Sequence, residues 1–234
     1  MRKADDAGFS IGRDDDGKML VVTDIWTDRT RAAFVESEAD GLLLNYARGF
    51  RERDLRLLEG LHIRRLQILA RTHTDLTPLY SLAESLESLT IEVSDGATLD
   101  LGRLPLVKSL AAEWPGVRET FSAASSLCSV VLMNYDAPDF VELGSHERLR
   151  ALTIKVAPRL QSVAGLELFK QLETFALFGA PQLRDVDALT AARGLKELQL
   201  EDCRLLSDLD FVRCLDGLEF LNVSDCGEID SLTP

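Results

Sequence analysis

The sequence has few of the residues that build catalytic and metal sites. Its 234 residues include 3 histidines and 4 cysteines, and no HExxH or CxxC motif occurs. His62, His73 and His146 are scattered along the chain, so we expect no zinc site. We also expect no hydrolase nucleophile elbow. These absences favour a protein that is not an enzyme and that has no metal or other cofactor.

Positive charge and long apolar runs are scarce too. Lysine and arginine total 26 against 39 acidic residues, giving a net charge of −13 and a pI near 4.7. This balance argues against nucleic-acid binding and against docking on anionic membranes. No apolar run approaches the roughly 18 residues of a membrane helix, and no secretory signal is visible. We therefore expect a cytoplasmic protein, whose acidic charge serves solubility or attracts a basic protein partner.

The chain does contain one short pattern, apolar-x-x-apolar-x-apolar, in nine copies. The copies start at Ala39, Ile63, Leu86, Val107, Leu127, Leu149, Leu172, Leu195 and Leu218. Successive starts lie 20 to 24 residues apart, and a period in this range is typical of a repeat solenoid. Within each copy the alternation of apolar and other residues predicts a short strand with its apolar side chains facing inward. Stacked turns would then form a parallel sheet.

The second half of most turns carries apolar residues at steps of three. Leu160, Val163, Leu166 and Phe169 form one such series. This spacing suits 3₁₀ or short helical segments on the side of the solenoid opposite the strands.

The segment Leu195–Leu209 resembles a leucine-rich repeat. The common step of 22–23 residues, together with Asp75-Leu76-Thr77-Pro78-Leu79, is similar to the short bacterial, SDS22-like class of these repeats. The resemblance covers residues 39–234. It implies an α/β solenoid, a right-handed superhelix with a concave parallel β-sheet and short 3₁₀, helical or irregular convex segments. It also implies a non-enzymatic role in protein binding.

Three turns depart from the family pattern. The position eight residues after the first apolar residue is usually asparagine in the family, and here it holds Arg71, Pro115 and Tyr135 in turns two, four and five. We expect these turns to be less regular. The repeat register between Gly96 and Ser126 stays open.

The N-terminal part does not match the repeat. We predict a cap over residues 1–38, followed by the repeat domain over 39–234. Phe9–Ile11 and Met19–Trp26 have strand-like composition, and the acidic segment Arg13–Gly17 between them ends in glycine, so this region is predicted to form a β-hairpin.

The end of the predicted cap is expected to be helical. Asp28–Glu36 is predicted to form a short helix with Asp28 as its N-cap. The segment Gly12–Lys18 matches the GxxxxGK pattern of a phosphate-binding loop, but Met19 stands where serine or threonine would hold Mg²⁺. A hairpin turn is therefore favoured over a nucleotide site.

The repeat template exposes alternate strand residues on the concave face. In the middle turns this places apolar residues side by side, with glutamates in the flanking turns, as is typical of protein interfaces. The predicted acidic flanks are Glu92 and Glu113 on one side and Glu197 and Glu201 on the other. The predicted partner-binding residues are Val131, Met133, Thr153, Lys155, Ala176, Phe178, Gln199 and Glu201. Of these, Val131, Met133, Ala176 and Phe178 are predicted to form an exposed, partly apolar strip.

The function predicted from this face is that of a protein–protein interaction scaffold. The alternative is an acidic immunity or antitoxin-type protein that neutralises a basic toxin. Cys203 and Cys226 occupy equivalent positions in adjacent turns, within reach of a disulfide, although packed free thiols are favoured.

The last turn begins at Leu218, and the sequence stops at Pro234. We expect this turn to expose a strand edge at Leu221–Val223 and apolar surface that includes Ile229 and Leu232. Because such an edge recruits other chains, the sequence predicts a fragment of a longer repeat protein or end-to-end self-association.

Overall fold

The computed structural model describes residues 8–228, and the chain folds as two compact units. Within the described residues the first unit contains residues 8–99 and 103–107, and the second contains 100–102 and 108–228. Ile229 and Leu232 lie outside the described residues, so the predicted end-to-end association stays a prediction.

The first unit contains five strands and one α-helix. These elements are β1 (Phe9–Asp14), β2 (Gly17–Val22), α1 (Asp28–Glu36), β3 (Gly41–Asn45), β4 (Arg65–Ala70) and β5 (Ser88–Val93). Strands β1 and β2 form an antiparallel hairpin, and β2 to β5 then pair in parallel in chain order. Three 3₁₀ segments connect the parallel strands: η1 (Tyr46–Arg48), η2 (Arg56–Leu58) and η3 (Thr77–Leu82).

The hairpin contains the GxxxxGK match. Asp14 pairs with Gly17 at the turn, where the backbone N–H of Asp16 donates to Asp14 Oδ1 over 3.1 Å. Met19 lies in strand β2, so the segment lacks the following helix that a phosphate-binding loop requires. The hairpin turn is confirmed, and the role of this region as a cap stays a prediction.

Helix α1 has the predicted bounds, Asp28–Glu36, but its N-cap is not the predicted residue. Thr27, not Asp28, is the N-cap, because its backbone is extended and its Oγ1 accepts a hydrogen bond from the backbone N–H of Thr30 over 3.2 Å. Asp28 lies in the first turn, where a carboxylate is favoured by the helix dipole.

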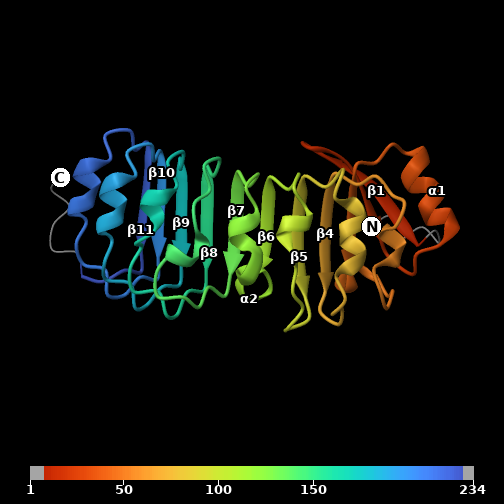
Figure 1. Ribbon diagram of the computed structural model, residues 1–234, viewed down its shortest axis with the longest axis horizontal. Coiled ribbons are helices and arrows are strands. Elements are labelled where there is room, and N and C mark those ends of the chain that lie inside the picture. Colours follow the sequence, from red (N-terminus) through yellow and green to blue (C-terminus); the bar gives the residue numbers. More distant parts are fainter. Residues whose placement is uncertain (1–7, 229–234) are drawn as a thin grey trace, which may run out of the picture. The chain divides into compact units, whose positions relative to one another are not determined.

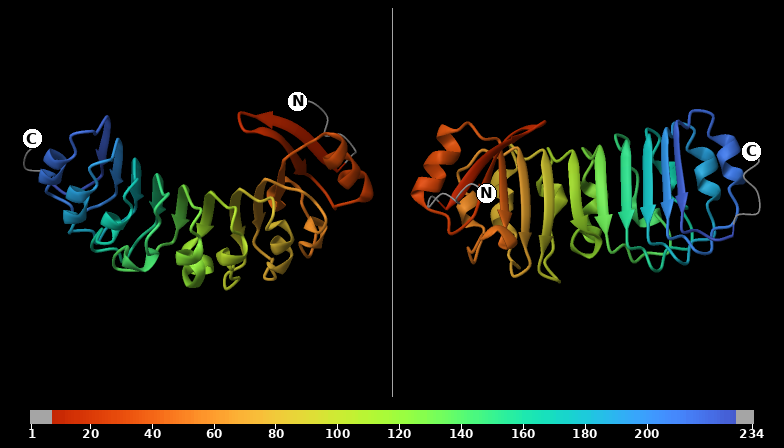
Figure 2. Two further views of the ribbon diagram at one scale, coloured as in Figure 1. Left: turned by 45° about the horizontal axis from the view of Figure 1, so that its top comes forward. Right: turned by 180° about the vertical axis from the view of Figure 1, so that it is seen from behind.

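The second unit contains six parallel strands that lie side by side (Figure 1). They are β6 (Ser109–Glu113), β7 (Ser129–Met133), β8 (Ala151–Lys155), β9 (Thr174–Phe178), β10 (Glu197–Glu201) and β11 (Phe220–Ser224). The strands line one side of the unit and short helical segments line the other (Figure 2). These segments are α2 (Trp114–Val117), η5 (Arg118–Ala123), η6 (Val141–Leu143), η7 (Leu166–Leu168), η8 (Asp187–Ala191) and η9 (Asp210–Cys214). A further segment, η4 (Leu101–Arg103), has its first two residues in the second unit and its last in the first.

The predicted strand positions are confirmed in all nine copies, because β3 to β11 each begin two residues after the first apolar residue of a copy. The apolar strand residues point inward, as Leu198 and Leu200 in β10 show, with side chains fully buried. Leu221 occupies the equivalent position in β11 and is 41% exposed. The core of each unit is thus a stack of apolar residues between strands and helical segments.

An aspartate lies one or two residues before most of the 3₁₀ segments. Its carboxylate accepts a hydrogen bond from the backbone N–H two residues later, a turn that leads the chain into the helical segment. The pairs are Asp54–Arg56, Asp75–Thr77, Asp100–Gly102, Asp139–Val141, Asp185–Asp187 and Asp208–Asp210, with distances of 2.7 to 3.0 Å. Part of the strongly acidic composition therefore serves the fold.

The turn around Pro115 is irregular, as expected. Trp114–Val117 forms the short helix α2, and the Trp114 indole packs against Tyr135 and Phe121 with ring centroids 5.0 and 5.7 Å away. Tyr135 is also fully buried, and its hydroxyl donates to the backbone oxygen of Asp139 over 2.5 Å. Burial raises the pKa of the Tyr135 hydroxyl well above its usual range. Large aromatic residues thus fill the interior where the repeat pattern is weakest.

Candidate protein-binding face

The exposed face of the second sheet presents three rows of side chains. Because neighbouring parallel strands are in register, residues at the same position of each strand lie about 4.8 Å apart across the sheet. The first row is Ser109, Ser129, Ala151, Thr174, Glu197 and Phe220. The second is Ala111, Val131, Thr153, Ala176, Gln199 and Asn222. The third is Glu113, Met133, Lys155, Phe178, Glu201 and Ser224.

All eight predicted partner-binding residues fall in the second and third rows. The register places Met133 beside Lys155 and Lys155 beside Phe178, on three consecutive strands. Met133 and Phe178 are partly exposed, and Lys155 is exposed. Within the described residues the Lys155 ammonium forms no ion pair, so it is available to a carboxylate or carbonyl oxygen of a partner.

The prediction that Ala176 forms part of an exposed strip is wrong. Ala176 lies on the predicted face, but its side chain is only 4% exposed. The register puts it between Thr153 and Gln199, and longer neighbours on each side cover a single methyl group. The exposed apolar surface of the middle turns therefore comes from Val131, Met133 and Phe178, with Ala176 as its floor.

Acidic residues of the second unit lie beside this apolar surface. Glu113 precedes Met133 in the third row, and its Oε2 accepts a hydrogen bond from the side-chain amide of Asn134 over 2.6 Å. Glu201 follows Phe178 in the same row. Glu92 belongs to the first unit, where its carboxylate accepts a hydrogen bond from Arg71 Nε over 2.6 Å. Of the four glutamates predicted to flank the apolar strip, Glu113, Glu197 and Glu201 therefore belong to the same unit as the strip, and Glu92 does not.

The rim of the face has an unusual backbone. The residue directly after each of strands β7 to β11 has a positive φ, between 51° and 75°. These residues are Asn134, Val156, Gly179, Asp202 and Asp225. Their N–H groups extend the pairing, since Val156 N–H donates to Phe178 O over 2.8 Å and Gly179 N–H to Glu201 O over 2.9 Å. This position was not predicted from the sequence, although glycine, asparagine and aspartate at a fixed place in the repeat are its usual signal.

The other chemistry that the sequence suggested remains weak. Within the described residues no group of three or more His, Cys, Asp or Glu side chains is placed to hold a metal ion. Cys203 and Cys226 are free thiols. A GxSxG pattern does occur in the sequence, at Gly8–Gly12, so the expectation that there is none was wrong. Ser10 of that match lies inside strand β1 and pairs with Val21 of β2, whereas an elbow places serine between a strand and a helix.

The described part of the chain contains no helix with the length and apolar character needed to cross a membrane.

The comparisons with known proteins show the fold. No family model matches the chain, and no curated protein matches its sequence. Solved structures of three internalins from Listeria monocytogenes are similar. Internalin C2 has a TM-score of 0.57 and 17% identity, over 74% of this chain and 75% of that one. Internalin InlF has a TM-score of 0.63 and 17% identity, over 91% of this chain and 70% of that one.

The functional domain of InlJ, described as including a cysteine ladder, has a TM-score of 0.51 and 16% identity, over 82% of this chain and 43% of that one. The fold is a leucine-rich-repeat solenoid. At these identities the likeness shows the fold alone, and the repeat class inferred from the 22–23-residue steps stays a prediction.

Proposed function

We propose that the second unit is a protein-binding module whose partner docks on the exposed sheet face. The observation that carries the proposal is the row in which Met133, Lys155 and Phe178 lie side by side on β7, β8 and β9. Two large apolar side chains flank one cation that has no ion-pair partner in the described residues. A few large residues usually contribute most of the binding free energy of an interface, so Met133 and Phe178 are the proposed anchors.

The stiffness of this surface supports the proposal. The backbone of each of these strands is hydrogen-bonded on both sides, so the anchors are held in fixed positions before a partner arrives. A preorganised surface loses less conformational entropy on binding than a flexible one. The module needs no catalytic group for this role, and we propose no enzymatic activity.

The charge of the face narrows the class of partner. Glu113 and Glu201 lie beside the proposed anchors Met133 and Phe178, and Glu197 lies in the first row of the same face, against one lysine. We therefore propose a partner with an apolar centre and basic side chains around it, a class that includes a basic toxin. Charge complementarity of this kind raises the rate of association and weakens with added salt.

The proposal is tested by comparing three forms of the protein as bait. Phe178→Glu places a charge at the centre of the face, and Val141→Glu places the same charge on η6, where Val141 is 58% exposed and lies outside the sheet. A partner that binds the unaltered protein and Val141→Glu but not Phe178→Glu supports the proposal. A partner that still binds a Met133→Glu/Phe178→Glu double variant contradicts it.

A further inference from the structure

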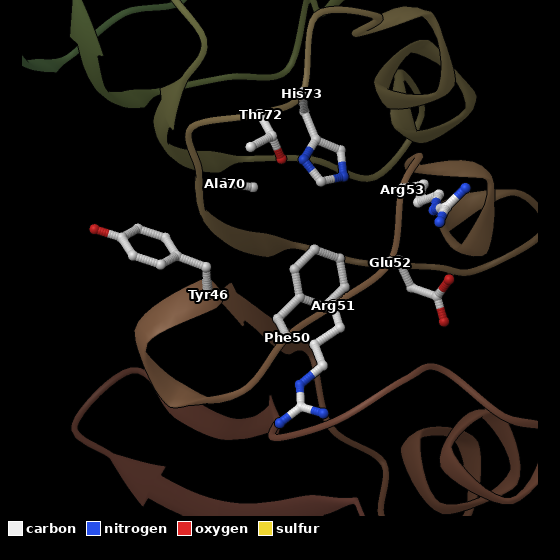
Figure 3. A pocket seen from close by; sticks show the side chains of 8 residues that line it. All are labelled: Tyr46, Phe50, Arg51, Glu52, Arg53, Ala70, Thr72 and His73. Carbon is white, nitrogen blue, oxygen red and sulfur yellow. The ribbon is translucent and has the colours of Figure 1, made fainter.

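A cavity of about 300 Å³ in the first unit lies where the chain leaves β3 and β4 (Figure 3). Two rings of its lining, those of Phe50 and His73, are buried and stack on each other with centroids 5.9 Å apart. The cavity therefore presents no open aromatic surface to a ligand. The outer edge of the hairpin in the same unit, by contrast, presents backbone groups that have no partner.

Strand β1 forms one edge of the sheet, and within the described residues it pairs with β2 alone. The pairing shows which of its backbone groups point away from β2. The N–H of Thr23 donates to Gly8 O over 2.9 Å, and such hydrogen-bonded positions of an antiparallel pair alternate with positions whose N–H and C=O groups face outward. The outward positions of β1 are therefore Phe9, Ile11 and Arg13.

The side chain of Ile11 also lacks a neighbour on this edge. Ile11 lies opposite Leu20 in the hairpin, so the two side chains lie on the same face of the sheet. Leu20 is fully buried in the core of the first unit, whereas Ile11 is 44% exposed. A further strand along the outer edge of β1 would pair with the outward backbone groups and place a side chain beside Ile11.

The outward positions of β1 are self-complementary. Phe9 and Arg13 lie at equal distances along the strand on either side of Ile11. A second β1 running antiparallel would therefore pair Ile11 with its own copy, and Phe9 of each chain with Arg13 of the other. A shift of two residues in either direction would leave an outward position without an outward partner in β1. The matched register has a two-fold axis, which is the commonest symmetry of soluble oligomers.

The charges of the hairpin agree with the antiparallel arrangement. Asp15 and Asp16 of the turn are exposed, and neither forms an ion pair within the described residues. An antiparallel pair places the two acidic turns at opposite ends, whereas a parallel pair would bring them together at a cost in repulsion. The antiparallel register also puts the guanidinium of Arg13 next to the ring of Phe9 in the other chain, a favourable combination of cation and aromatic face.

We propose that two copies of this chain associate through their β1 strands, which pair antiparallel about a two-fold axis at Ile11. The sheet of each copy then continues into that of the other. This contact involves neither the protein-binding face of the second unit nor strand β11, so it is independent of the proposed function.

Sedimentation velocity over a series of chain concentrations tests the association. We expect a monomer–dimer equilibrium in the unaltered protein. Ile11→Lys places two ammonium groups together at the two-fold axis and should weaken the dimer at least about tenfold. Val141→Lys places the same charge on η6, at a position that is 58% exposed, and should leave the dimer unchanged. A protein that stays monomeric at about 1 mM chain, or equal dimerisation of the two variants, would overturn the proposal.

Amide hydrogen exchange in the unaltered protein tests the register within one strand. The outward N–H groups of Ile11 and Arg13 should exchange at least about tenfold more slowly when nearly all of the protein is dimeric than when it is dilute. The N–H groups of Ser10 and Gly12 point toward β2 and serve as internal references, since their hydrogen bonds exist in the monomer. Unchanged exchange at Ile11 and Arg13 in the dimer, or equal slowing at all four amides, would overturn the proposal.

Discussion

Val156 occupies in one repeat the backbone position that Gly179 occupies in the next. Both residues directly follow a strand, and both have a positive φ, 60° and 75° respectively. Glycine adopts this conformation without strain, whereas a β-branched side chain rarely does. Val156 is also 54% exposed, so its side chain gains little from burial that could offset the strain. The repeat architecture therefore imposes a conformation that this residue does not favour.

Replacing Val156 by glycine should stabilise the protein. Relief of the left-handed strain is worth on the order of 1 kcal/mol, which exceeds the entropic cost of a more flexible unfolded chain. The measurement is the free energy of unfolding in urea. Val141→Gly is the matched control, because Val141 is similarly exposed but has no positive φ, and it should destabilise the protein. If both variants lose stability equally, the position is not strained.

Truncation of two neighbouring residues in β10 should change the stability by very different amounts. Leu198 is fully buried, so Leu198→Ala should cost on the order of 2–5 kcal/mol through lost packing and a cavity. Gln199 points to the exposed face, and Gln199→Ala should change stability by less than about 0.5 kcal/mol. Denaturant unfolding measures both values. Similar losses at the two positions would contradict the observed strand register.

Mild acid should destabilise the second unit through His146. The ring is buried, with Nδ1 3.2 Å from Ala124 O and Nε2 3.0 Å from Leu143 O. Burial lowers the pKa of His146 below its usual 6.5 and outweighs the two carbonyl oxygens, which act in the opposite direction. The unfolded chain then takes up a proton at a higher pH than the folded chain does. The stability that His146 contributes is therefore complete above about pH 6.5 and falls on acidification.

The comparison that isolates this effect uses His146→Gln. Urea midpoints of the unaltered protein and the variant, followed by circular dichroism at about pH 7.5 and pH 5.5, bracket the relevant range. We expect the midpoint of the unaltered protein to fall more between these values than that of His146→Gln. Parallel decreases would assign the pH dependence to other groups.

Thiol reactivity should differ sharply between two cysteines of the second unit. Cys214 is exposed at the end of η9, whereas Cys203 is buried. Burial is the main cause that raises the pKa of the Cys203 thiol to about 12, and the nearby Cys226 is the second. Because the thiolate is the reactive form, iodoacetamide should alkylate Cys214 first and leave Cys203 unmodified until the protein unfolds. Mass spectrometry of native, partly labelled protein checks this order.

The repeat pattern contained enough information to place the strands. An apolar residue at each inward position is required in every turn, so even the weak copies at Ala39 and Val107 could be found by their spacing. The left-handed position at Val156 could not be found from its own side chain, because backbone pairing with the next strand, and not local preference, sets its φ.

The candidate sites were less accessible to sequence analysis. Alternation along a strand identified the face but not the cover over Ala176, which depends on the lengths of its neighbours. The hairpin was predicted, but its outer edge was not predicted as a binding surface. Which backbone groups of β1 face outward depends on the exact pairing of β1 with β2, which the composition of the two strands leaves open.

The division of the chain into two units leaves one indole in each. The protein has 2 tryptophans, Trp26 in the first unit and Trp114, fully buried, in the second. Intrinsic fluorescence of a Trp26→Phe protein would therefore report only on the second unit, and that of a Trp114→Phe protein only on the first. The chain thus supplies its own pair of optical reporters for asking whether the two halves of the solenoid unfold together or in sequence.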